Sequence, residues 1–133
     1  MTIEVIKDIA TRARAIMDEH HDNLSRVYFG SFPSSACGNI SDMLALYMGK
    51  KGIRQIEYVW GKRNGRSHGW LEIEENIIDI TSDQFDDGQG AVYVGKSTDF
   101  YNSFTEQFRS TPSISSCLVG AYNKFEKLME ENV

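Results

Sequence analysis

The stretch from residue 53 to residue 80, IRQIEYVWGKRNGRSHGWLEIEENIIDI, decides the fold. It contains three runs rich in Ile, Val, Tyr and Trp, at 53–60, 67–73 and 76–80, and residues of this kind favour strands. Short turns that contain glycine or charged residues separate the runs. Because short connections join antiparallel strands, the pattern predicts an antiparallel β-meander. A further apolar run at 91–94 predicts one more strand.

Helical patterns flank the meander on both sides. Apolar residues recur every three or four positions in Ile3–Met17, Ile40–Met48 and Leu118–Met129, and this spacing is typical of amphipathic helices. The second of these helices is expected to begin near Cys37. Helices before and after one antiparallel sheet predict an α+β fold, with the helices packed on the sheet. The length fits one domain that spans residues 1–133.

Two segments have less regular patterns. Val27–Phe29 is expected to be a short extended run that leads into a loop at 30–35. The phenylalanines Phe100, Phe104 and Phe108 fall at intervals of four, which fits either a helical face or an aromatic-rich loop.

The composition is that of a folded domain with an acidic surface. The 133 residues include 14 Lys+Arg and 19 Asp+Glu, which gives a formal net charge of −5; 41% of residues are hydrophobic and 25% are charged. A nucleic-acid binder needs clustered Lys and Arg to neutralise phosphates, so no nucleic-acid partner is expected. The two basic clusters, Lys50-Lys51 with Arg54 and Lys62-Arg63 with Arg66, are interpreted as solvated turns.

The sequence also favours a cytoplasmic location. No run approaches the roughly 18 apolar residues of a membrane helix, and Glu4, Lys7 and Asp8 interrupt any apolar core of a secretory signal. A reduced cytoplasmic protein without a membrane partner is therefore expected, and export without an N-terminal signal stays open. The two cysteines, Cys37 and Cys117, cannot form a disulfide framework. A single bridge between them is an alternative, and Cys117 is otherwise interpreted as structural.

Two polar groups suggest metal binding, but neither fits its chemistry. His20 and His21 are adjacent on a helix, so their side chains point apart, and their position suits the negative end of the helix dipole. The segment Asp86-Asp87-Gly88 lacks the spacing and the terminal Glu of a calcium loop. The sequence therefore predicts no metal and no cofactor.

Cys37 is the first residue that points to catalysis. It lies where a loop becomes a helix, and the free N–H groups and the dipole at a helix N-terminus stabilise a thiolate and lower the thiol pKa. Gly38 leaves room for a substrate carbonyl beside the sulfur. A small buried cysteine is the structural alternative.

His68 and Asp79 lie on neighbouring predicted strands. A two-residue turn at Glu74-Glu75 places Trp70 opposite Asp79, with His68 diagonal to Asp79 on the same face. A three-residue loop turns Asp79 to the other face. With the tight turn, Cys37, His68 and Asp79 match a nucleophile, a base and an orienting carboxylate. Trp70 is expected to shield the pair from water.

These residues carry a resemblance to a known family. Cys37-Gly38 at a helix start, SHGWLE at Ser67–Glu72 and Asp79-Ile80-Thr81 on the next strand resemble the transglutaminase-like superfamily of papain-like cysteine enzymes, over roughly Val27 to Phe85. The resemblance implies a papain-like fold in which the nucleophile helix packs on the meander. It implies Cys37 as nucleophile, His68 as general base and acid and Asp79 as orienting residue, with protein or peptide substrates and no cofactor.

The sequence departs from the family pattern in three places. Gly69 stands where the family usually has Ala, and Glu74-Glu75 is an unusual turn. No Gln closely precedes Cys37 and no Trp precedes it at all, so the usual side-chain donor to the oxyanion is not identifiable. The Cys37 N–H supplies one donor. The candidates for a second are the hydroxyls of Ser31, Ser34 and Tyr28.

The leading hypothesis is a thiol-dependent amide hydrolase or acyltransferase, of the protease, deamidase or transglutaminase type. A second hypothesis is a catalytically silent binding or immunity-type module on the same fold, favoured by the unidentified oxyanion donor and by an acidic charge that suits a basic partner. A third is a redox protein that uses Cys37 and Cys117, although no Cys-x-x-Cys is present. The outcome of the reaction, the substrate and the oligomeric state stay open.

Overall fold

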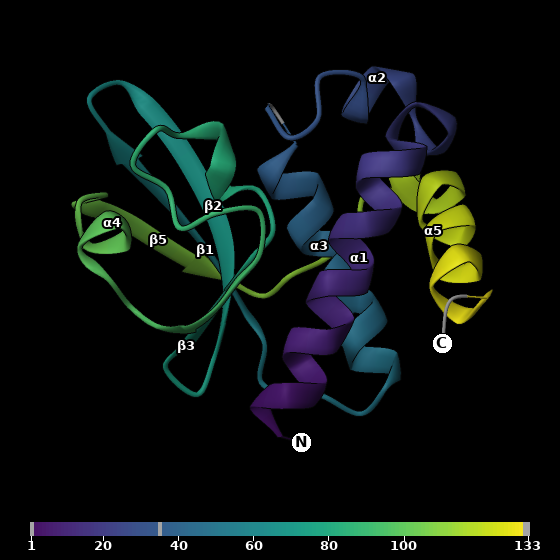
Figure 1. Ribbon diagram of the computed structural model, residues 1–133, viewed down its shortest axis with the longest axis horizontal. Helices are drawn as coiled ribbons and strands as arrows, with labels where there is room; N and C mark the ends of the chain where they lie inside the picture. The colour runs from purple at the N-terminus through teal and green to yellow at the C-terminus, as the bar shows by residue number, and fades with distance from the viewer. Residues whose placement is uncertain (1, 35, 132–133) are drawn as a thin grey trace.

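The computed structural model describes residues 2–34 and 36–131 and arranges them as a layer of helices against a five-stranded antiparallel sheet (Figure 1). This confirms the predicted α+β class. In chain order the helices and strands are α1 (Ile3–Leu24), α2 (Arg26–Phe29), α3 (Cys37–Lys50), β1 (Glu57–Arg63), β2 (Arg66–Ile73), β3 (Asn76–Asp79), the 3₁₀ turn η1 (Ser82–Gln84), β4 (Tyr93–Lys96), α4 (Asp99–Asn102), β5 (Glu106–Ser110), the 3₁₀ turn η2 (Ser116–Leu118) and α5 (Val119–Glu131).

The predicted meander forms the centre of the sheet. The strand order is β4-β3-β2-β1-β5, so β1, β2 and β3 are consecutive neighbours and β5 returns to pair with the free edge of β1. Ile73 pairs with Asn76 across Glu74-Glu75, which is the predicted two-residue turn. Both glutamates have left-handed backbone angles, with φ of 50° and 69°, as a type I′ hairpin turn requires.

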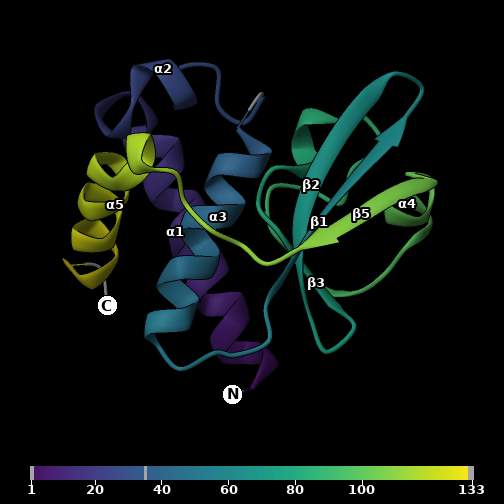
Figure 2. The same ribbon diagram turned by 180° about the vertical axis from the view of Figure 1, so that it is seen from behind.

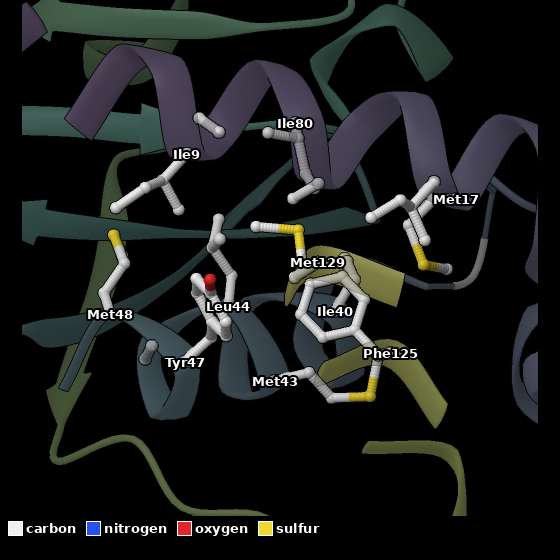
Figure 3. Close-up of a cluster of buried hydrophobic side chains, with 14 of the residues drawn as sticks. Ile9, Met17, Ile40, Met43, Leu44, Tyr47, Met48, Ile80, Phe125 and Met129 are labelled. Atoms are coloured by element: carbon white, nitrogen blue, oxygen red, sulfur yellow. The ribbon is translucent and has the colours of Figure 1, made fainter. Parts of the chain in front are cut away.

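Helices α1 and α3 both pack on the sheet, α3 on β2 and β1 and α1 on β3 and β4, and α5 packs on α1 away from the sheet (Figures 1 and 2). The apolar faces of these helices meet the side of β2 and β3 that carries Leu71 and Ile78. We call the buried side chains between helices and sheet the helical core. Figure 3 shows part of it: Ile9, Met17, Ile40, Met43, Leu44, Tyr47, Met48, Ile80, Phe125 and Met129.

The opposite face of the sheet carries a second group of buried side chains, which we call the aromatic cluster. Side chains alternate between faces along a strand, so Trp70 of β2 lies on this face while its neighbour Leu71 joins the helical core. Helix α4 covers the face (Figure 1). The members of the aromatic cluster are Val59, Trp70, Ile77, Phe85, Phe100, Tyr101 and Phe104.

Several predicted segments differ from the structure. Val27–Phe29 is not extended, because Ser25 accepts a hydrogen bond from the Tyr28 N–H at 3.2 Å and caps the one-turn helix α2. Strand β1 begins at Glu57 and strand β4 at Tyr93, so both start later than predicted. Strand β5 was not predicted. The loop at 30–35 forms turns as far as Ser34, and Ser35 lies outside the described residues. In the described part of the chain, no helix has both the length and the apolar character that a bilayer crossing requires.

Candidate active site

His68 and Asp79 form a buried pair on the face of the sheet that carries the aromatic cluster. His68 Nε2 lies 2.7 Å from Asp79 Oδ2, and the two residues are 0% and 2% exposed. The short Glu74-Glu75 turn produces this contact, because it fixes the register that brings the two side chains to one face. The pairing predicted from the sequence is therefore present.

Asp79 is held by hydrogen bonds on both of its oxygens. Oδ1 accepts from the Thr81 N–H at 2.9 Å and from the Thr81 hydroxyl at 3.4 Å, and Oδ2 accepts from the Tyr101 hydroxyl at 2.9 Å as well as from His68. The hydrogen bonds compensate the burial of this carboxylate and fix it in position. Sequence reasoning missed Tyr101, since its segment gave only an aromatic pattern.

Aromatic rings surround the His68 imidazole. The ring centroids of Trp70, Phe85, Phe100 and Phe104 lie between 5.1 and 6.0 Å from that of His68. These side chains exclude water from the His–Asp pair. Trp70 is one of them, as the sequence predicts. Trp70 is fully buried, so it also serves as a core residue.

The second ring nitrogen of His68, Nδ1, is the one that Asp79 does not bind. In the neutral imidazole, where Nε2 donates to Asp79, the lone pair is on Nδ1, and this buried atom has no hydrogen-bond partner among the described residues. Burial by itself lowers the pKa of His68, but the Asp79 carboxylate, with a smaller contribution from the Cys37 sulfur, raises it to about 9. Cys37 is thus one of the groups whose charge acts on the imidazole.

Cys37 is half-buried at the first residue of α3. The N-cap residue is Ala36, which makes no side-chain hydrogen bond to the helix. The N–H groups of the first helical turn have no acceptor within the helix. They are therefore available to an oxygen bound beside the cysteine sulfur.

Tyr58 of β1 is a neighbour of Cys37 that the sequence did not reveal. Its hydroxyl lies 3.3 Å from the position that a Cβ on Gly38 would occupy, and its ring lies across Gly69. Burial, and then the charges of Cys37 and Asp42, raise the pKa of Tyr58. The signal in the sequence was Gly69, where the pattern that the sequence resembles has Ala. The meaning of this glycine depends on a contact between strands.

The three predicted second donors do not bond to Cys37 within the described structure. Ser31 and Ser34 lie on an exposed turn, where the Ser34 N–H donates to the Ser31 carbonyl at 2.9 Å. The Tyr28 hydroxyl interacts with Cys117, and this hydrogen bond raises the pKa of Tyr28. Cys37 and Cys117 are both free thiols, so the alternative of a bridge between them is not realised.

The other polar groups considered from the sequence have partners of their own. His21 Nδ1 donates to the Phe29 carbonyl at 2.7 Å, and Asp87 forms a two-point ion pair with Arg63 at 2.6 and 2.9 Å. Within the described ranges, no group of three or more His, Cys, Asp or Glu side chains has the arrangement of a metal site.

A pocket of about 320 Å³ runs along α3 away from Cys37. It begins at Asp42, which stands one helical turn from Gly38 on the same face. Burial raises the pKa of Asp42 to about 6. Most of the other lining is apolar and includes Leu46, Ile56 and Ile114.

Comparisons with protein-family models, with curated proteins and with solved structures found no match to the chain. Its function is therefore inferred from the geometry of the site and from the chemistry of the residues in it.

Proposed function

We propose that the chain is a cysteine-dependent amide hydrolase or acyltransferase, similar in mechanism to the transglutaminase-like enzymes. Cys37 is the nucleophile, His68 the general base and acid, and Asp79 the residue that positions His68. One observation carries the proposal: a fully buried His68–Asp79 pair keeps a second imidazole nitrogen without a partner, next to a cysteine at a helix start. A histidine that only stabilised the core would have a partner on that nitrogen.

In the first half of the reaction, Cys37 Sγ bonds to the amide carbonyl carbon while its proton passes to His68 Nδ1. The carbonyl becomes an oxyanion beside the first turn of α3, where N–H groups stabilise its charge. His68 then gives its proton to the leaving nitrogen. The C–N bond breaks, an amine or ammonia leaves, and Cys37 retains the acyl group as a thioester.

In the second half, a nucleophile enters and His68 Nδ1 again accepts a proton. Water yields a carboxylic acid, and an amine yields a new amide. In both cases the C–S bond breaks and the proton returns from His68 to the Cys37 sulfur. Asp79 accepts the Nε2–H throughout, which keeps Nδ1 directed toward the sulfur.

The substrate class that fits this site is an exposed peptide or a side-chain amide on a protein. The apolar pocket along α3 lies on the same helix face as Gly38, so a residue next to the reacting amide can place an apolar side chain there.

The test is to trap the thioester. The protein is incubated with a pool of glutamine-containing peptides and hydroxylamine, and intact-mass measurement follows both the peptides and the protein. We expect a hydroxamate, a one-unit deamidation gain, a cleaved peptide or an adduct on Cys37. Cys37→Ala should abolish every product, while Cys117→Ala, the matched change at the exposed free thiol, should retain them.

Two results contradict the proposal. Activity that persists in Cys37→Ala places the nucleophile elsewhere. A Cys37 that reacts with iodoacetamide no faster than a peptide thiol, with no product from any peptide, leaves the binding-module hypothesis in its place.

A further inference from the structure

We propose that the Tyr58 hydroxyl is the second donor of the oxyanion hole, acting together with the Cys37 N–H. The proposal rests on the function proposed above and names the donor that neither the family pattern nor the sequence supplied. Three independent observations carry it: the space at Gly69, the proximity to Gly38 and Cys37, and the free state of the hydroxyl.

The missing side chain at Gly69 makes room for the Tyr58 ring on the sheet. Tyr58 pairs with Leu71 of β2, so Gly69 is its diagonal neighbour on the same face. A Cβ on Gly69 would lie 2.7 Å from Tyr58 Cζ and 2.8 Å from Cε1, closer than carbon atoms approach without displacement. The alanine usual in the family therefore cannot coexist with this ring position. The absent methyl group leaves room for the ring beside Gly69, and the hydroxyl reaches the start of α3.

The hydroxyl arrives at the end of α3 where the oxyanion forms. It lies 3.3 Å from the Cβ position of Gly38, the residue after the nucleophile, and it interacts with the charge of Cys37. Gly38 has no side chain to fill this place. The hydroxyl therefore lies near the first turn of α3, whose N–H groups have no acceptor within the helix.

Tyr58 and His68 approach Cys37 from different sides. Tyr58 is opposite Leu71, and His68 is three positions before Leu71 on β2, so the two side chains leave opposite faces of the sheet. An acyl carbon attacked by the sulfur needs its base on one side and its oxyanion donors on another. The sheet provides this separation.

The Tyr58 hydroxyl is also protonated and free to donate a hydrogen bond. Among the residues that the structure describes, no hydrogen-bond partner is found for it, so a ligand oxygen can accept its proton. Burial and the nearby acidic charges raise the pKa of Tyr58, so the hydroxyl stays protonated across the physiological range.

Two reagents separate this role from the function of Cys37. Iodoacetamide alkylates the sulfur by displacing iodide and forms no oxyanion. p-Nitrophenyl acetate acetylates the same sulfur through a tetrahedral oxyanion: the S–C bond forms, p-nitrophenolate leaves, and the thiol proton passes to His68. In Tyr58→Phe we expect acetylation of Cys37 to fall about 10- to 100-fold, while iodoacetamide alkylation stays within about 3-fold of the original.

Two further variants complete the test. Tyr122→Phe is the matched control, because its hydroxyl bonds to Glu126 on α5 at 2.8 Å, away from the proposed site, and it should leave both rates unchanged. Gly69→Ala should reproduce the selective loss of acetylation, because the added methyl group displaces the Tyr58 ring. Circular dichroism of each variant establishes that it is folded.

The outcomes are distinct. If the original protein reacts with both reagents no faster than a peptide thiol, the proposed function fails. If it reacts fast with both and Tyr58→Phe acetylates at the original rate, the function stands and the role of Tyr58 is overturned. A rise of both rates in Tyr58→Phe also overturns it, since the hydroxyl would then be holding the sulfur in an unreactive state.

Discussion

The chemistry of His68 is controlled by one carboxylate. Asp79 accepts the Nε2–H at 2.7 Å and is itself held by Thr81 and Tyr101. The position of the proton on the imidazole is therefore determined by a rigid neighbour. As a result the neutral imidazole carries its lone pair on Nδ1, and the raised pKa of His68 favours the imidazolium.

Replacement of Asp79 by Asn should reverse this arrangement. The amide introduced by the substitution would donate to Nε2 and move the imidazole proton to Nδ1, which then cannot accept the proton of Cys37. We expect Asp79→Asn to slow acetylation of Cys37 by about 10³-fold or more without loss of helical circular dichroism. Asp86→Asn, a change at an exposed carboxylate, is the matched control and should have no effect.

The His68 titration gives a second measurement on the same variant. Because the carboxylate raises the pKa of His68 to about 9, the imidazole ring protons should titrate near pH 9 in NMR spectra of the original protein. In Asp79→Asn the raising charge is gone while burial still lowers the pKa, so the midpoint should move to lower pH. An unchanged midpoint would show that Asp79 does not control the imidazole.

At the scale of elements, the β2–β3 hairpin shows what the sequence could predict. The apolar runs on each side of Glu74-Glu75 predicted the two strands, and the two-residue turn was the alternative that places His68 and Asp79 on one face. The contact of His68 with Asp79 followed from that register. The helices α1, α3 and α5 were predictable for the same reason, since each has one continuous apolar face.

Other elements depend on contacts that the sequence does not record. All five residues of β5 are exposed, so no apolar alternation marks the strand, and it exists because its backbone pairs with the edge of β1. The helix α2 did carry a signal, the capping residue Ser25, which the apolar run at 27–29 obscured. Tyr58 became part of the candidate site only through its position across Gly69.

The backbone conformation of the Glu74-Glu75 turn predicts substitutions that raise the stability of the protein. Both residues are held in the left-handed region, which disfavours residues with a Cβ. The β1–β2 turn has the same left-handed angles at Asn64-Gly65, the sequence that this turn type prefers. Glu74→Asn combined with Glu75→Gly should therefore raise the free energy of unfolding by about 1 kcal/mol, measured by urea denaturation.

A charge effect is separated from the backbone effect by a second pair of changes. Glu74→Gln with Glu75→Gln removes both charges and keeps both side chains, so it should change the free energy of unfolding by less than about 0.5 kcal/mol. If this pair stabilises the protein as much as the first, repulsion between the glutamates and not the backbone conformation is the dominant cost.

At the scale of the whole molecule, the candidate site joins two separate groups of buried side chains. His68 and Asp79 belong to the face of the sheet that carries the aromatic cluster, whereas Cys37 begins a helix whose apolar face lies in the helical core. The sheet lies between them, and α3 packs directly on β2 (Figure 2). The proposed nucleophile and its proposed base are therefore aligned only while the two groups stay docked through the sheet.

This arrangement predicts that helices and sheet unfold as one cooperative unit. Both tryptophans, Trp60 and Trp70, lie in the sheet, so their fluorescence reports the sheet, while circular dichroism at 222 nm reports mainly the helices. Leu44 is 1% exposed in the helical core, and Leu44→Ala should lower the free energy of unfolding by about 3 kcal/mol. The loss should be equal by both probes although Trp70 lies in the aromatic cluster, because two-state unfolding gives coincident transitions.

Val27→Ala, at a side chain that is 88% exposed, is the control and should shift neither transition. If Leu44→Ala moves the helical transition and leaves the tryptophan transition in place, the sheet and its aromatic cluster fold without the helices, and the alignment of Cys37 with His68 depends on a docking step that can be lost while the sheet remains folded.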